Sequence, residues 1–319
     1  MLRLIAARLA QSIVLLLLIS IVVFALLRLA PGDPGVQLYG ADATAQDLAQ
    51  IRQVWGLDDP IHIQYLRWLS NAIGGDLGRS YIDGRPALAV IAERVPATLL
   101  LSSTALLFAI LTGIPLGLLA ATHRSSLLDR IVTLLATTMY SIPPFWLGIL
   151  LILVVSLKLN WLPSGSMFTA AGEPGVLDLL RHLTLPALTL ALRDVGRFAR
   201  VSRASIIEEL GRDYLRTAAA KGMSRGIIAT RHTLRNALLP IITLIGLSVP
   251  ALLSGALVVE MVFAWPGMGR LAIESALQRN YPVVLGEVLV VAVLAILGSL
   301  LADIAYSVAD PRIGKANGL

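Results

Sequence analysis

Residues that could perform catalysis or ligate a metal are few and far apart in this sequence. It contains no cysteine. Its histidines are widely separated, at His62, His123, His182 and His232. The chain has no His-Glu-x-x-His pair of a zinc protease, no Gly-x-Ser-x-Gly turn of a serine hydrolase and no Gly-Lys-Ser/Thr phosphate loop. We therefore expect no catalytic residue, no metal and no cofactor in this chain, and an intramembrane hydrolase is disfavoured.

The charged residues that do form a pattern are basic. Ten Lys and Arg residues fall between Arg193 and Arg235, both included. Arg193, Arg197 and Arg200 are spaced i, i+4 and i+7, so they share one face of a helix. If this helix enters a membrane, Arg193, Asp194 and Arg197 must face protein or water, because ionised groups face lipid only at high cost. We predict that they line the inner mouth of a transport path; a solvated loop is the alternative.

The composition places these residues in a membrane protein. Hydrophobic residues make up 56% of the chain and charged residues 14%, and the mean hydropathy is +0.79. Soluble domains carry about a quarter charged residues. The net charge of +6 does not indicate a nucleic-acid partner, because membrane proteins concentrate Lys and Arg in their cytoplasmic loops.

Six stretches without Asp, Glu, Lys or Arg predict an all-α membrane protein with six transmembrane helices. They are 9–27, 95–123, 131–157, 182–192, 236–259 and 288–302. The fourth is too short to span unless it includes the charged residues from Arg193 onward, and the sixth also needs Pro282–Glu287. Basic residues are commoner at the two chain ends and after the second and fourth spans, which predicts cytoplasmic N- and C-termini.

The connection between the first two spans, residues 31–94, is enlarged and net acidic. Pro60 at a first helical position predicts a helix that ends at Gly74-Gly75. One side of this helix is apolar and aromatic, with Ile61, Tyr65, Trp68 and Leu69. Two arrangements fit the pattern: the helix lies flat on the outer membrane surface, or it docks on the helix bundle.

Helix-breaking residues fall inside three of the predicted spans. They are Gly113, Pro115 and Gly117 in the second span, Pro143 and Pro144 in the third, and Pro250 in the fifth. We predict breaks that free backbone carbonyls, as in a bundle that rearranges around a path. A further cluster, Pro266, Gly267 and Gly269, lies in the outer connection 263–282. It predicts either a plain sharp turn or a hairpin that enters the outer vestibule.

The source of energy separates two classes of transporter. A self-sufficient secondary transporter or channel, the alternative function, needs paired ionisable groups near the middle of the membrane. Glu260, Glu287 and Asp303 instead fall near span ends. The energy is then expected from a partner. The segment 216–222 is rich in alanine and has no long apolar face, which suits close docking into a groove of that partner.

Ten short motifs, in order along nearly the whole chain, resemble those of one family. They are Pro-Gly-Asp-Pro at 31–34, Gly-Leu-Asp-Asp-Pro at 56–60, Gly-Asp-Leu-Gly-Arg-Ser at 75–80, Arg-Val-Pro-Ala-Thr at 94–98, Ser-Ile-Pro at 141–143, Asp-Tyr-Leu-Arg-Thr-Ala at 213–218, Lys-Gly at 221–222, Arg-His-Thr-Leu-Arg-Asn-Ala-Leu-Leu-Pro at 231–240, Pro-Gly-Met-Gly at 266–269 and Asp-Pro-Arg at 310–312. The chain resembles the permease subunit of binding-protein-dependent ABC importers, of the dipeptide, oligopeptide and nickel branch that also includes glutathione systems. Within that branch it resembles the first of the two permease types.

The resemblance implies a coupling helix that seats in a cleft of an ATPase subunit. The family pattern Glu-Ala-Ala-x-x-x-Gly, counted back from Gly222, puts a basic residue, Arg216, where the family has Glu. The residues carried over to this role are Arg216, Thr217, Ala218, Ala219, Ala220, Lys221, Gly222 and Arg225.

The resemblance also implies how the chain and its complex are organised. We expect an anchor span over 1–30, an extracytoplasmic helical loop over 31–94, a transmembrane domain of the type I importer fold over 95–310 and a cytoplasmic tail over 311–319, with the coupling loop at about 213–235. The expected partners are a second permease subunit, two ATPase subunits that hold ATP and Mg, an extracytoplasmic substrate-binding protein and the lipid bilayer. The expected function is ATP-driven import of small peptides by a multi-pass protein of a bacterial or archaeal plasma membrane.

Overall fold

The computed structural model describes residues 2–29, 44–170, 175–212, 222–223 and 234–309. Every regular element within these residues is helical. The helices form two compact units, one built on residues 99–265 and 297 onward, and the other on residues 2–98 and 266–296. The prediction of an all-α protein is confirmed.

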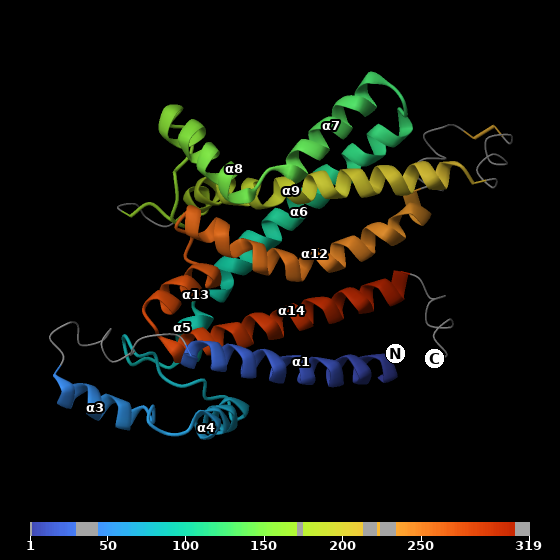
Figure 1. Ribbon diagram of the computed structural model, residues 1–319. Coiled ribbons are helices and arrows are strands. Elements are labelled where there is room, and N and C mark those ends of the chain that lie inside the picture. The colour runs from blue at the N-terminus through green and yellow to red at the C-terminus, as the bar shows by residue number, and fades with distance from the viewer. Residues whose placement is uncertain (1, 30–43, 171–174, 213–221, 224–233, 310–319) are drawn as a thin grey trace. The chain divides into compact units, whose positions relative to one another are not determined.

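The first unit is organised around one long helix. α9 (Val176–Leu210) is 35 residues long and packs against α7 (Leu127–Ser141), α8 (Pro144–Leu151) and α12 (Leu234–Val262), as Figure 1 shows. α8 continues into a π-helical turn, η1 (Ile152–Lys158). α9 is therefore the element that positions its neighbours in this unit.

Small residues let α9 approach α6 (Val95–Thr122) closely. A Cβ atom on Gly113 of α6 would lie 2.8 Å from the carbonyl oxygen of Val195, and one on Gly117 would lie 2.6 Å from that of Ala199. α6 runs unbroken through Pro115, so the predicted break in the second span is wrong. The two glycines serve close helix packing instead, and this packing holds the helix where Pro115 removes one backbone hydrogen bond.

The third predicted span is sharply bent at its two prolines. α7 ends at Ser141, α8 begins at Pro144, and the two helices differ in direction by 100°. Pro143 and Pro144 lack the backbone N–H that would continue a helix, and a residue that precedes proline disfavours the helical conformation. The break predicted at Pro143 and Pro144 is confirmed.

The second unit contains the N-terminal helix and the enlarged loop. Its helices are α1 (Leu2–Leu29), α3 (Ala45–Val54), α4 (Ile61–Ile73), α5 (Ala87–Ala92), α13 (Met268–Leu277) and the first part of α14 (Tyr281–Ala309). Its core is formed by Leu77, Ala87, Ile91, Met268, Leu271 and Val283. Pro60 is the N-cap of α4 and not its first residue, one position away from the prediction. α4 packs against α1, so it docks on the helix bundle, and the membrane contact of the other predicted arrangement stays a prediction.

Three predicted spans, or four if the bent α7–α8 pair counts as one span, correspond to helices that are apolar and long enough to cross a membrane. Within the described residues these are Ala10–Leu29, Ala87–Thr122, Tyr281–Leu300 and, as one bent span, α7 with α8 and η1. α9 carries the fourth predicted span and continues without interruption through Arg193, Asp194 and Arg197. α12 includes the fifth. The total of six spans and the cytoplasmic termini stay predictions.

Candidate functional site

A buried ion pair joins α7 to α9. Asp129, in the first turn of α7, accepts hydrogen bonds from Nε and Nη2 of Arg203 on α9, at 2.6 and 2.8 Å. Its carboxylate also accepts one from the backbone N–H of Ser125, and its own N–H donates to the hydroxyl of Ser126, the N-cap of α7. The Asp129 side chain is buried and the Arg203 side chain is partly exposed. This two-pronged pairing fixes the register of α7 against α9.

Further along the same two helices, two arginines approach one aromatic ring. The guanidinium carbons of Arg193 and Arg200 lie 5.6 and 5.4 Å from the centre of the Tyr140 ring. Both distances are within the range of a cation–π interaction. Because both arginines of α9 approach the same ring of α7, the predicted shared helix face is confirmed for Arg193 and Arg200.

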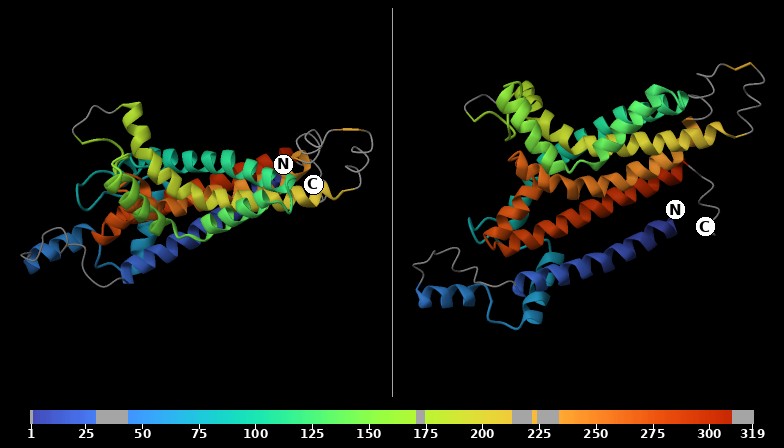
Figure 2. Two further views of the ribbon diagram at one scale, coloured as in Figure 1. Left: turned by 90° about the horizontal axis from the view of Figure 1, so that it is seen from above. Right: turned by 45° about the horizontal axis from the view of Figure 1, so that its top comes forward.

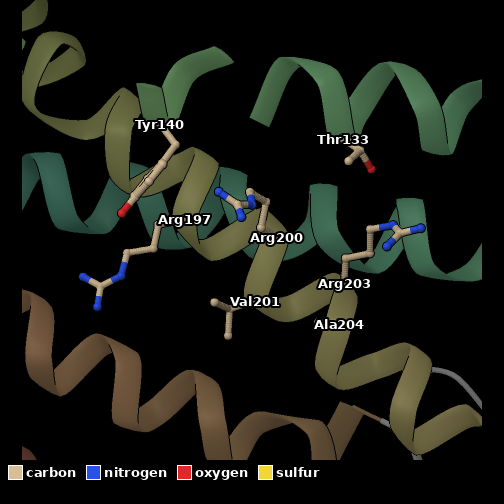
Figure 3. Close-up of a pocket in the computed structure, with 7 residues that line it drawn as sticks. All are labelled: Thr133, Tyr140, Arg197, Arg200, Val201, Arg203 and Ala204. Carbon is tan, nitrogen blue, oxygen red and sulfur yellow. The ribbon is translucent and has the colours of Figure 1, made fainter. Parts of the chain in front are cut away.

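These helices line an open pocket of about 570 Å³. Figure 3 shows its lining, with Arg197, Arg200 and Arg203 in chain order along α9 and with Thr133 and Tyr140 on α7. Arg203 is paired with Asp129, but within the described part of the chain Arg193, Arg197 and Arg200 form no ion pair. The pocket therefore carries surplus positive charge, which suits an anionic group.

A second pocket, of about 520 Å³, lies beside the bend between α7 and α8. Its lining combines hydroxyl, apolar and aromatic side chains from both sides of the bend. It consists of Thr137, Thr138, Ser141, Ile142, Pro143, Phe145 and Trp146. The proline break thus exposes a mixed surface at the end of α7, where Ser141 directly follows Tyr140 in the chain.

Two family models match the chain. Residues 113–315 match the binding-protein-dependent transport system inner membrane component, and residues 1–102 match the N-terminal part of such membrane components. The chain belongs to this family. It is therefore an inner membrane permease of a transport system and not a catalytic subunit.

Relatives of the permease are similar along almost their whole length. It is 41% identical over 307 residues to the oligopeptide transport system permease protein AppB of Bacillus subtilis, which covers 96% of this chain and 97% of that protein. It is 40% identical over 313 residues to the glutathione transport system permease protein GsiC of Salmonella paratyphi A, which covers 98% and 99%. Among solved structures, the MetNI methionine ABC transporter in an inward-facing conformation matches with a TM-score of 0.59 and 16% identity, over 70% of this chain and 97% of that chain. That likeness shows that the chain has the fold of an ABC importer permease.

The path residues predicted from sequence fall in different places of the permease. Arg193 and Arg197 meet in the α7–α9 region, with half-buried Asp194 between them on α9. Pro143 lines the pocket at the bend, and Pro144 begins α8. α12 runs through the position of Pro250, so the break predicted in the fifth span is wrong; the side chain of Pro250 lies outside the described residues.

The Pro and Gly cluster belongs to the second unit. Pro266, Gly267 and Gly269 surround the start of α13, where the backbone N–H of Met268 donates to the hydroxyl of Thr98 at 2.8 Å. The segment is a turn that leads into a short helix. Its entry into an outer vestibule stays a prediction.

The predicted coupling residues 216–221 and Arg225 lie outside the described residues. Gly222 is described: it is exposed, it has a φ of +82°, and a Cβ atom there would meet open space. Glycine adopts this left-handed conformation without the strain that a side chain adds. The coupling role of the whole segment stays a prediction.

Two residues of the α7–α9 site were not singled out by sequence patterns. For Asp129 a signal existed, because it is the only carboxylate between Glu93 and Glu173 and it follows Ser126 at capping-box spacing. Tyr140 offers no such signal, because its ring meets arginines that are more than fifty positions away in the chain.

Proposed function

We propose that this permease is one of two membrane subunits of an ATP-driven importer for small peptides. The relatives that support this cargo are an oligopeptide and a glutathione permease, each about 40% identical over nearly the full length of both chains. Such cargo carries free carboxylate groups. A permease for this cargo therefore needs a transport path that binds anionic groups only weakly.

The observation that carries the proposal is the set of arginines on α9 without an ion-pair partner in the described residues. Arg193 lies ten residues before Arg203, which is about 15 Å along a helix. The hydrocarbon core of a bilayer is about 30 Å thick, so a helix whose Arg203 lies at the inner surface has Arg193 near the middle. A guanidinium at that depth requires water or protein around it. We infer that the α7–α9 pocket borders the aqueous path and that Arg197 and Arg200 contact cargo carboxylates in passing.

The same proposal covers the rest of the complex. We propose six spans with both termini in the cytoplasm, a second similar permease subunit, two ATPase subunits that bind ATP and Mg, and a substrate-binding protein on the outside. The coupling loop at about 213–235 transmits the closing of the ATPases to α9 and α12, which lead into and out of it. The family description, which names a binding-protein-dependent system, supports the external partner.

Peptide uptake by the reconstituted importer tests this proposal. The permease is co-expressed with the neighbouring transport genes, purified with the subunits that accompany it, and reconstituted with the binding protein. We expect uptake of a small peptide that requires ATP. Arg197→Gln and Arg200→Gln are each expected to lower uptake about tenfold, since a lost charge-assisted contact costs about 1.5 kcal/mol.

Arg181→Gln is the matched control, because Arg181 is an exposed arginine of the same helix outside the pocket. It should leave uptake unchanged. Ion-driven uptake by the permease alone would overturn the proposed energy source. Wild-type uptake by the Arg197→Gln/Arg200→Gln double variant would overturn the proposed path.

A further inference from the structure

α4 docks on α1 well inside the apolar stretch of α1. The hydroxyls of Tyr65 and Ser20 are hydrogen-bonded at 2.9 Å. The ring centre of Phe24 lies 5.4 Å from that of Tyr65 and 5.9 Å from that of Trp68. Ser20 and Phe24 are both buried by this contact. The middle of α4 is therefore held against positions 20 and 24 of α1.

The place of this contact sets the depth of α4 in a membrane. Ala10–Leu29 is apolar and long enough to cross a bilayer. Ser20 lies nine residues before Leu29 and Phe24 lies five before it, which is about 13 and 7 Å along a helix. One leaflet of hydrocarbon is about 15 Å thick. α4 thus lies beside the part of α1 that one leaflet surrounds, and not above the membrane in water.

One flank of α4 is polar and contacts the segment that leads back to α3. Gln64 Nε2 donates to the carbonyl oxygens of Leu57 and Asp59 at 3.0 and 2.6 Å, and Arg67 pairs with Asp59 at 2.9 Å. Residues 57–59 lead back to α3, which Figures 1 and 2 show beyond the C-terminal end of α1. The polar flank is therefore continuous with the segment that lies outside the apolar span.

The other flank of α4 is apolar. Leu66, Leu69 and Ile73 follow i, i+3 and i+7 spacing and form one stripe. Leu66 is 60% exposed and Ile73 is 80% exposed. Val22 and Leu26 of α1 are also exposed, at the same depth as the contact with α4. The stripe continues an apolar surface that a spanning helix presents to lipid.

We propose that α4 is an interfacial helix and that acyl chains cover its Leu66–Leu69–Ile73 stripe. The lipid belongs to the leaflet around the C-terminal half of α1, which is the outer leaflet in the proposed orientation. A helix with one apolar and one polar flank lies in the plane of the interface, with Arg67 and Asn71 on the water side. The membrane then supports the loop that follows α4, where the Tyr81 N–H donates to Oδ1 of Asn280 at 2.9 Å.

Fluorescence quenching tests the proposal directly, because the chain has no cysteine and accepts single labels. Leu66→Cys and Ile73→Cys carry a small fluorophore, in the full-length permease with its accompanying subunits, in phosphatidylcholine vesicles. Asn71→Cys is the matched control, an exposed position on the polar flank of the same helix. Quenching by phosphatidylcholine brominated on its acyl chains is compared with quenching by aqueous iodide.

We expect the ratio of lipid to iodide quenching to be several-fold higher at positions 66 and 73 than at position 71. Equal ratios at the three positions would overturn the proposal, because they would put both flanks in one medium. Protection of positions 66 and 73 from both quenchers would also overturn it, because a protein partner would then cover the stripe. Neither result depends on transport, so the proposed cargo is tested separately.

Discussion

The ion pair between Asp129 and Arg203 offers the sharpest test of how α7 and α9 are held together. Asp129→Asn keeps the shape of the side chain and its bond from the Ser125 N–H but removes the charge. Breaking a fully buried pair costs about 3–5 kcal/mol, and an exposed one below about 1 kcal/mol. The Asp129 side chain is 6% exposed and that of Arg203 is 30% exposed, so we expect about 2 kcal/mol of lost stability. That is roughly a 30-fold change in the folded-to-unfolded ratio.

A double-mutant cycle measures this coupling. Asp129→Asn, Arg203→Gln and the double variant are unfolded in mixed micelles with increasing SDS, and tryptophan fluorescence reports the midpoint. The two single variants should together lose about 1–2 kcal/mol more free energy of unfolding than the double variant loses. The control cycle uses Glu208 and Arg212, an exposed pair at the C-terminal end of α9 at 3.5 Å, whose coupling should be near zero. If the two cycles gave equal couplings, the structural role assigned to the buried pair would be refuted.

Four further predictions follow from single positions. Gly196→Ala should destabilise the α7–α9 contact by about 1–3 kcal/mol in the same unfolding assay, because its Cβ would overlap a backbone carbonyl of α7; an unchanged midpoint contradicts this packing. Gly222→Trp should abolish uptake while the protein still inserts, and undiminished ATP-driven uptake would contradict the coupling role. Arg193→Cys should react with a water-soluble maleimide, whereas labelling by a lipid-confined probe would put it against acyl chains. Hydrogen bonds from the backbone N–H and hydroxyl of Thr169 lower the pKa of Asp178 below its usual value, so Asp178→Asn should lower the melting temperature at pH 7. That difference should vanish as the pH falls through the lowered pKa, since the wild-type carboxylate then takes up its proton, and a difference that persists in acid would contradict the assignment.

The prolines and glycines show which helix breaks can be predicted from the sequence and which cannot. The adjacent pair Pro143-Pro144 breaks its span as predicted, because two successive residues cannot donate to the helix and the position before them avoids helical angles. The single Pro115 does not break α6, because one missing hydrogen bond is tolerated in a helix held by close neighbours. The local sequence shows which residues can break a helix, but it does not show that Gly113 and Gly117 pack on α9.

The sequence by itself determined that this permease lies in a membrane, that it is all-α and which family it resembles. It also located the face of α9 that carries the arginines. Hydropathy, helical spacing and short motifs are properties of neighbouring residues, so they can be read without a fold. Only the tertiary structure decided that Arg203 pairs with Asp129 while Arg193 and Arg200 approach Tyr140. Those contacts depend on how two helices, separated by more than thirty residues of chain, meet side by side. The distinction between an arginine that pairs with a carboxylate and one that approaches an aromatic ring is therefore a property of helix packing.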